Sequence, residues 1–211
     1  MKTPYPQTDK DWKRREITDP ERDWSYAGKT WVEDYFLSRA HPHRKLIMGA
    51  IERLQPRSIF ELGCNAGPNL VNISKEYPGI LLAGIDPNED AINYAQLRLP
   101  PHTSLDNVSL FDLKVSRPTF DVVLSDAALM YFDPEQIGKA LTMLSGMAKR
   151  AMILVERQSE KSELTGSVWA HDFENRLKDI GYIVESSPIT EEQWPGSPNW
   201  VKYGRFIVAT K

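Results

Sequence analysis

A mostly apolar, strand-sized segment followed by a loop with two glycines carries the clearest chemical signal in this sequence. Residues 58–62 contain one acid, Glu61, among apolar neighbours, a pattern typical of a buried parallel strand. Gly63 and Gly67 bracket the loop, and Pro68 is placed to begin a helix, where its missing N–H costs nothing. Glycine lets the backbone approach a ligand, and a helix N-terminus offers unpaired N–H groups. This arrangement therefore predicts a nucleotide-type binding site.

A second acid follows at the distance at which the next strand would deliver it to the same ligand. The apolar run 80–85 predicts a strand, and Asp86 comes directly after it, 23 positions after Gly63. In a strand–helix–strand unit, an acid at about this distance can accept hydrogen bonds from both hydroxyls of a ribose. Asp86 could instead cap a helix, because Pro87 and Asn88 begin another helical segment.

The loop lacks two glycines of a dinucleotide-binding site. Asn65 and Pro68 stand where the pattern G-x-G-x-x-G needs its second and third glycine, which disfavours a nicotinamide cofactor. The pattern E-x-G-x-x-x-G resembles motif I of the class I S-adenosylmethionine-dependent methyltransferases. Asn65 replaces the commoner glycine of that family, and asparagine tolerates left-handed backbone conformations better than most residues. The resemblance implies S-adenosylmethionine as the cofactor, with Glu61 helping to hold its ammonium group.

The resemblance also implies contacts for the rest of the cofactor. In this family, an acid or amide after the third strand accepts a hydrogen bond from the adenine amino group. Asp106 fits this position, and Asp112 is its rival because the spacing is ambiguous. Residues 120–125 (FDVVLS) closely match the fourth strand common in the family. The expected cofactor-binding residues are Glu61, Gly63, Cys64, Asn65, Gly67, Asp86, Pro87, Asp106, Asn107 and Ser125.

The order of the predicted elements indicates an α/β fold. Five strand–helix steps lead to a helix over 169–180 and then to two strands, at 182–185 and 205–209. We expect a Rossmann-like seven-stranded sheet, mostly parallel with an antiparallel last strand, and helices on both faces. The resemblance covers residues 45–211, the expected methyltransferase domain. An N-terminal arm and aromatic helical cap are expected over residues 1–44.

Aromatic residues gather near the N-terminus and in one late loop. Residues 1–23 are polar and aperiodic, which is typical of a loose arm. Residues 24–36 hold five aromatic residues, most of which should pack on the sheet; they are Trp24, Tyr26, Trp31, Tyr35 and Phe36. The loop 191–200 holds two tryptophans, which is unusual unless the loop covers a site. The residues expected to close over an acceptor are Trp31, Tyr35, Arg39, Trp194 and Trp200.

Side chains that could accept a proton follow the fourth and fifth strands. The sulfonium of S-adenosylmethionine already activates its methyl group, so a base is needed only if the acceptor must lose a proton. Asp126 and Tyr131 follow strand four. Tyr131 occupies a position where related enzymes often carry histidine, and His171 is the expected substitute unless it is only a partly exposed helix residue. His41 and His43 lack a nearby third ligand, which favours surface polar residues over a metal site, so no metal is expected.

Composition favours an ordinary globular protein that acts on a small molecule. The 211 residues carry a net charge of −3 and 41% apolar residues, and the single cysteine excludes an intrachain disulfide. The N-terminus lacks an apolar leader and the apolar runs are too short to cross a membrane, so a cytoplasmic monomer or homodimer is expected. The mild acidity argues against a nucleic-acid partner. Residues 125–128 (SDAA) also differ from the motif of DNA amino-methyltransferases.

The predicted function is methyl transfer from S-adenosylmethionine to an O- or N-nucleophile of a small molecule, such as a sugar or another metabolite. Residues 61–70 and 169–173 look most like methylases associated with pseudaminic-acid biosynthesis. A nucleic-acid or protein methyltransferase remains an alternative. A non-catalytic module that only binds the cofactor is another, because binding does not prove turnover.

Overall fold

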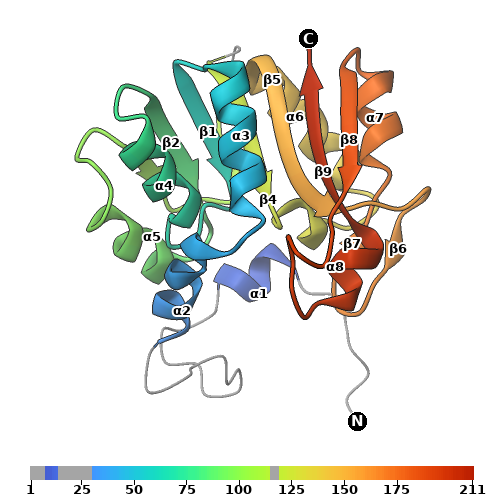
Figure 1. Ribbon diagram of the computed structural model, residues 1–211, viewed down its shortest axis with the longest axis horizontal. Helices are drawn as coiled ribbons and strands as arrows, with labels where there is room; N and C mark the ends of the chain where they lie inside the picture. Colours follow the sequence, from blue (N-terminus) through green and yellow to red (C-terminus); the bar gives the residue numbers. More distant parts are fainter. Residues whose placement is uncertain (1–7, 14–29, 115–118) are drawn as a thin grey trace.

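A seven-stranded sheet forms the centre of the computed structural model, which describes residues 8–13, 30–114 and 119–211 (Figure 1). The strand order is β3-β2-β1-β4-β5-β9-β8, and β9 is antiparallel to both of its neighbours while the pairs among β1 to β5 are parallel. This confirms the predicted fold class. The strands are β1 Ser58–Leu62, β2 Leu81–Ile85, β3 Ser104–Asp106, β4 Phe120–Asp126, β5 Ala148–Arg157, β8 Ile183–Pro188 and β9 Gly204–Thr210.

Helices cover both faces of the sheet (Figure 1). One face packs against α3 Arg44–Leu54, α4 Pro68–Glu76 and α5 Glu89–Gln96, and the other against α6 Ile137–Met147 and α7 Phe173–Asp179. Neighbouring strand residues alternate between the two cores: Ile59 belongs to the first and Phe60 to the second. Because both faces are covered there, β1, β2 and β4 are buried over most of their length, which is why they read as apolar runs.

Three short helices gather at the carboxyl ends of the parallel strands (Figure 1). They are α1 Asp9–Lys13, α2 Trp31–Leu37, which continues into the 3-10 turn η2 Ser38–Ala40, and α8 Pro198–Tyr203. A capping box at the start of α2 joins Thr30 to Glu33 and satisfies two of its free N–H groups. Ligands of open α/β sheets bind at this edge, so these helices are placed to cover a site.

Several local predictions were wrong. The arm predicted to be loose contains α1 within residues 8–13, and the helix predicted over 169–180 begins only at Phe173. Trp169–Ala170 instead forms strand β7, which pairs with β6, Glu163–Leu164. The two-tryptophan loop holds α8, which starts with Pro198 at its first turn. Trp24 and Tyr26 lie outside the described residues.

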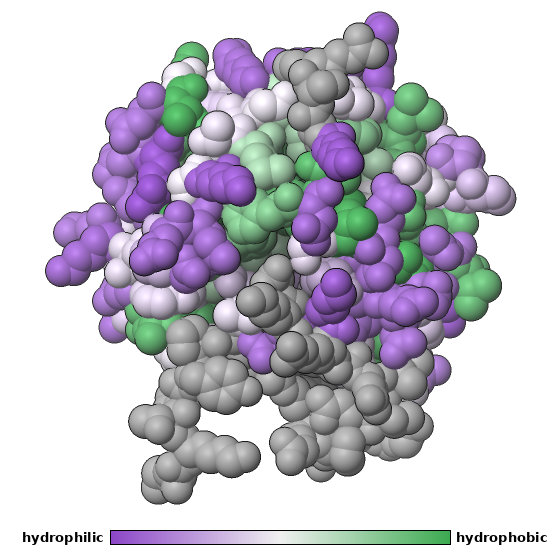
Figure 2. Space-filling view, turned by 180° about the vertical axis from the view of Figure 1, so that it is seen from behind, coloured by the Kyte–Doolittle hydropathy of each residue, from purple (hydrophilic) through white to green (hydrophobic). Residues whose placement is uncertain are grey.

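The face behind the view of Figure 1 carries mainly hydrophilic side chains toward its edges, with apolar side chains gathered toward its middle (Figure 2). Two of the most exposed large apolar side chains of the described chain are Leu97 and Ile183. Scattered exposure of this kind is ordinary for a globular protein. Among the described helices, none is long and apolar enough to span a bilayer.

Candidate cofactor and acceptor site

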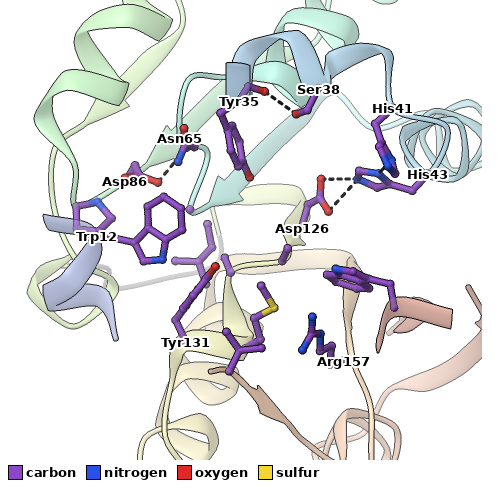
Figure 3. A pocket seen from close by; sticks show the side chains of 18 of the residues that line it. Trp12, Tyr35, Ser38, His41, His43, Asn65, Asp86, Asp126, Tyr131 and Arg157 are labelled. Carbon is purple, nitrogen blue, oxygen red and sulfur yellow. Dashed lines mark hydrogen bonds and ion pairs between the residues drawn. The ribbon is translucent and has the colours of Figure 1, made fainter. Parts of the chain in front are cut away.

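A cavity of about 970 Å³ lies at the carboxyl ends of the parallel strands. One half is lined by the glycine loop and the ends of β2 and β3, with Gly63, Asn65, Asp86, Pro87, Val108, Ser109 and Leu110. The other half is lined by aromatic, histidine and arginine side chains, among them Trp12, Tyr35, His41, His43, Tyr131, Arg157, Trp194 and Trp200. Figure 3 shows side chains from both halves pointing into the same space. The volume is within the range of pockets that hold small organic ligands.

The glycine loop needs the backbone freedom that its sequence suggests. Gly63 has a φ of 66°, and a Cβ added there would lie 2.6 Å from the Cβ of Ala128. Asn65, with a φ of 48°, adopts the left-handed conformation expected for it and lines the cavity. Cys64 and Gly67 do not line the cavity; Cys64 is buried behind the loop, and Gly67 approaches α5. Cys64 and Gly67 were expected to contact the cofactor, but they support the loop and do not line the cavity.

Glu61, at the end of β1, is a buried acid with an unfilled hydrogen-bonding capacity. Its Oε1 accepts from Asn69 Nδ2 at 2.7 Å, whereas its Oε2 is buried with no hydrogen-bond partner in the described structure. Burial raises the pKa of Glu61 to about 8, against the lowering effect of the Asn69 hydrogen bond. Glu61 does not itself line the cavity, although Leu62 and Gly63 beside it do; its buried oxygen without a donor would suit the ammonium group of S-adenosylmethionine, which would supply one.

Binding of S-adenosylhomocysteine at pH 7 is expected to release up to about one proton from Glu61. With a pKa of about 8 the carboxyl group is mostly protonated at pH 7, and an arriving ammonium favours the ionised form. Calorimetric titration in two buffers of different ionisation enthalpy measures the release. Glu61→Gln is the control and should show none. A binding enthalpy that does not depend on the buffer would contradict this role.

Asp86 is both a loop anchor and a cavity residue. Its Oδ2 accepts from the backbone N–H of Asn65 at 3.0 Å, and its Oδ1 accepts from the N–H of Asn88 at 2.9 Å. Burial raises its pKa to about 6, although both hydrogen bonds oppose the rise. Each oxygen keeps a second lone pair, so the carboxylate can still accept from two ribose hydroxyls. The helix cap itself is supplied by Asn88, whose side chain accepts from Ala91 N–H.

Asp86→Asn is expected to weaken binding of S-adenosylhomocysteine by about 1–3 kcal/mol, because it removes a charged acceptor from the ribose site. The dissociation constant from calorimetry measures the effect. The matched control is Asp106→Asn, an exposed residue that does not line the cavity. Equal losses for the two variants, or no loss for Asp86→Asn, would leave Asp86 as a loop anchor only.

The structure corrects the predicted adenine end. Asp106, at the end of β3, Asn107 after it, and Asp112, in the 3-10 turn Leu110–Asp112, are exposed and do not line the cavity. Asn107 instead donates through Nδ2 to the carbonyl of Asp86 at 3.1 Å. The residues that line this end are Val108, Ser109 and Leu110. An adenine here would contact these three residues, and no pattern in the sequence predicts such a contact.

Ser125 was predicted to touch the cofactor, but it is fully buried and donates through Oγ to Glu156 Oε1 at 2.7 Å. Glu156 also accepts from the backbone N–H groups of the turn after β4, at Ala128, Leu129 and Met130. The pair therefore holds the turn that carries Tyr131. Ala127, at the start of this turn, has a φ of 57°, an uncommon conformation for alanine at the edge of the cavity.

Aromatic side chains from distant parts of the chain wall the acceptor half. Trp12 of α1 packs edge-on against Trp31 and against Tyr131, with ring centroids 6.0 and 5.4 Å apart. Trp194 and Trp200 stack at 3.8 Å and line the cavity together. Arg39 does not line it; its guanidinium lies 4.6 Å from the ring centre of Phe36. Of the five residues expected to close over an acceptor, four therefore line the cavity, and Trp12 is an addition.

A buried polar network joins the two halves. Asp126 accepts from His43 Nε2 at 3.0 and 3.1 Å and from Arg44 Nη1 at 2.6 Å (Figure 3 shows the His43 bonds). Asn69 donates through Nδ2 to Asp126 at 2.9 Å and to Glu61 at 2.7 Å. The network thus runs from the acid at the end of β1 to the acid at the end of β4. Arg44 is 5% exposed, so its charge is compensated inside the protein.

The two histidines predicted to be surface residues belong to this network. His43 is 3% exposed and stacks on Trp194 at 4.2 Å, and both His41 and His43 line the cavity. Their Nδ1 atoms are 2.5 Å apart. Burial, followed by His43 and Arg44, lowers the pKa of His41 to about 4. The only sequence signal was their spacing around Pro42, which does not reveal that the turn faces the cavity.

Asp126, one of the candidate proton acceptors, lines the cavity, but its environment holds it ionised. Burial alone would raise its pKa, yet the charges of His43 and Arg44 and the hydrogen bonds from His43 and Asn69 place that pKa well below its usual range. A carboxylate of this kind is a poor proton acceptor. It is well suited to orient His43 and to stabilise an imidazolium there.

His171, the expected substitute for a histidine base, does not line the cavity. His171 is fully buried behind the cavity wall, where Nε2 contacts the carbonyl of Phe132 at 2.9 Å and Nδ1 contacts Ser162 Oγ at 2.8 Å. Burial lowers its pKa to about 4. Since both ring nitrogens are engaged, His171 is placed to pin the β6–β7 hairpin against the turn after β4. Tyr131 does line the cavity, as predicted.

Comparison with known proteins shows similarity to methyltransferases. Residues 59–150 match a family model described as a methyltransferase domain. The chain is 26% identical over 135 residues to trans-aconitate 2-methyltransferase of Afipia carboxidovorans, a match that covers 64% of this chain and 50% of that protein. The chain thus spans about half the length of the curated relatives it matches.

Solved structures share the fold at low sequence identity. The plantazolicin methyltransferase BpumL in complex with S-adenosylhomocysteine has a TM-score of 0.65 at 19% identity, with 96% of this chain and 93% of that chain covered. A Burkholderia thailandensis 1,6-didemethyltoxoflavin-N1-methyltransferase has a TM-score of 0.67 at 14% identity, with 85% and 81% covered. Residues 59–150 of the chain are therefore similar to a methyltransferase domain, and the chain shares the Rossmann-like fold of these solved methyltransferases.

Proposed function

We propose that the protein transfers a methyl group from S-adenosylmethionine to a small organic acceptor. The observation that carries this proposal is the continuity of the cavity, in which the glycine loop and Asp86 share one space with the aromatic and histidine wall. A methyl transfer needs its donor and acceptor held together with water excluded, because positioning supplies most of the catalysis. The single cavity of about 970 Å³ has room for both molecules.

The chain's own groups suit the cofactor at three points. Glu61 would accept a hydrogen bond from the ammonium group, Asp86 would accept from the ribose, and Gly63 would let the backbone approach the ligand. When bound, S-adenosylmethionine supplies an activated methyl group. No pyrophosphate-binding glycine pattern is present, so a nicotinamide cofactor does not fit the loop equally well.

A proton from the acceptor would go to the histidine pair. Ionised Asp126 can only accept, so His43 donates to it through Nε2–H and keeps an unprotonated Nδ1 toward His41. His41 then donates through Nδ1–H, and its Nε2 can take the proton only in passing, because burial and its neighbours lower the pKa of His41 to about 4. The Nδ1 contact lets that proton move on to His43, where the Asp126 carboxylate stabilises the resulting imidazolium. An acceptor with an O–H or N–H nucleophile suits this arrangement.

The names of the similar proteins suggest acceptors to test. The curated relatives act on trans-aconitate and the solved neighbours on plantazolicin or 1,6-didemethyltoxoflavin, according to their names. The resemblance to methylases of pseudaminic-acid biosynthesis adds sugars to this set. A nucleic-acid or protein substrate is less suited to a pocket walled by Trp12, Trp31, Trp194 and Trp200. A non-catalytic binding module would leave the histidine pair without a purpose.

Calorimetry and a product assay test the proposal together. The protein should bind S-adenosylmethionine and S-adenosylhomocysteine saturably and should not bind NAD. Incubation with S-adenosylmethionine and a panel of small acceptors should then yield S-adenosylhomocysteine and a methylated product, detected by mass spectrometry. Saturable NAD binding without S-adenosylmethionine binding would overturn the proposal.

A further inference from the structure

Arg157, at the end of β5, is a cation of the cavity wall without an acidic partner. It is half-buried, and its Nη1 donates only to Thr165, at 2.6 Å to the carbonyl and 3.0 Å to Oγ1. Its Nε is buried with no hydrogen-bond partner in the described part of the chain. Within those residues no carboxylate lies at ion-pair distance from it, whereas Arg44, the other arginine of the cavity wall, is paired with Asp126.

The neighbouring acid is not available to Arg157. Glu156 is fully buried, and its carboxylate accepts from Ser125 and from three backbone N–H groups of the turn after β4. It acts on Arg157 only at a distance, where it favours the charged form. Burial, the largest effect, lowers the pKa of Arg157, as expected for a guanidinium partly removed from water without a counter-ion. A half-buried charge of this kind is stabilised by any anion that reaches it.

The surroundings of Arg157 belong to the acceptor half. Its guanidinium lies 5.5 Å from the ring centre of Trp200, which stacks on Trp194. In Figure 3, Arg157 points into the pocket on the side opposite Asp86, the expected ribose site. Ser167 and Ser197 line the cavity as well and bring hydroxyl donors to this half. A flat aromatic wall beside a forked cation suits a planar acid, since a guanidinium binds a carboxylate through two parallel hydrogen bonds.

We infer that Arg157 forms an anion subsite for the acceptor, and that the acceptor carries a carboxylate held there. This inference rests on the proposed function only in naming the bound molecule as the methyl acceptor. Among the described residues of the wall, Arg157 is the only arginine or lysine without an ion pair, and one such charge matches a singly charged carboxylate better than a doubly charged phosphate. Asp126, which is held ionised on the wall of the same cavity, also disfavours a dianion.

The test is a binding screen of paired ligands. Full-length protein is titrated with small aromatic and aliphatic carboxylic acids, each paired with its own carboxamide, with and without S-adenosylhomocysteine. Ligand-observed NMR finds the binders and calorimetry gives their affinities. Acids should bind at least about tenfold more tightly than their amides, because this ratio corresponds to the usual free-energy contribution of a charge-assisted hydrogen bond. Inorganic phosphate should not displace a bound acid at equal concentration.

Variants locate the subsite. Arg157→Gln should lose the preference for acids, while Arg157→Lys should keep part of it because the charge remains without the fork. The matched control is Arg150→Gln, an exposed arginine at the opposite end of the same strand, which should behave as wild type. If Arg157→Gln does not fold, Arg157→Lys still tests the subsite, because its preference for acids should be weaker than that of the wild type.

Three outcomes would overturn the inference: no acid binds, amides bind as well as acids, or the preference survives in Arg157→Gln. Displacement of the acid by phosphate would overturn the choice of a carboxylate. Affinity for S-adenosylhomocysteine should be unchanged in the Arg157 variants. If the wild-type protein does not bind S-adenosylhomocysteine, the proposed function is contradicted. The titrations without S-adenosylhomocysteine would still test the anion subsite.

Discussion

Replacing Arg44 with methionine is expected to lower the free energy of unfolding by about 3–5 kcal/mol, because the substitution leaves a buried carboxylate without its ion pair. Arg44 and Asp126 are 5% and 4% exposed, and their ion pair measures 2.6 Å. Arg44 also donates to Asn69 Oδ1 and to the Ser38 backbone and side chain, so three further acceptors lose a donor. Denaturant unfolding followed by circular dichroism measures the change.

The same helix offers a matched control for Arg44. Arg53 of α3 forms an ion pair with Glu185, but the two side chains are 52% and 61% exposed. Exposed pairs contribute only about 0–1 kcal/mol, so Arg53→Met should change stability little. If the two variants lose equal stability, the buried ion pair of Arg44 with Asp126 does not stabilise the fold more than an exposed pair does.

Replacing His43 with alanine is expected to lower kcat about 100- to 10,000-fold, the usual contribution of a positioned acid–base group. The substitution removes the imidazole between Asp126 and His41, so a proton taken up at His41 can no longer move on. Single-turnover assays with saturating S-adenosylmethionine and an identified acceptor measure the effect. Affinity for S-adenosylhomocysteine should change little, which separates this effect from a loss of cofactor binding.

The remaining histidines provide the contrast. His102→Ala, at an exposed site outside the cavity, should leave kcat unchanged. His171→Ala should lower stability, because it breaks two buried contacts, but should not alter the pH profile. In the wild type, the rate should rise with pH through about 4, where His41 becomes unprotonated, and then level off. A normal kcat for His43→Ala would remove the histidine pair from the mechanism.

The fold, the glycine loop and the position of Asp86 could be predicted from the amino-acid sequence, whereas the residues at the expected adenine end could not. Apolar runs mark strands buried on both sides, and Gly63 and Gly67 mark a turn whose φ values require glycine. Asp86 directly follows the second strand, and its distance from Gly63 is set by the length of the one helix between them. These signals are local, because each depends on residues within one strand–helix–strand unit. Spacing of this kind can be read directly from the sequence.

The tertiary structure decided the acceptor half, which is assembled from distant segments. Asp126 was recognised from its strand, but its partners His43 and Arg44 lie more than 80 positions earlier. Trp12 reaches Tyr131 from a segment that reads as a loose arm, while His171 is turned away from the cavity by two contacts. Contacts of such separation depend on how the chain ends and loops pack at the sheet edge, and neither periodicity nor spacing records that packing.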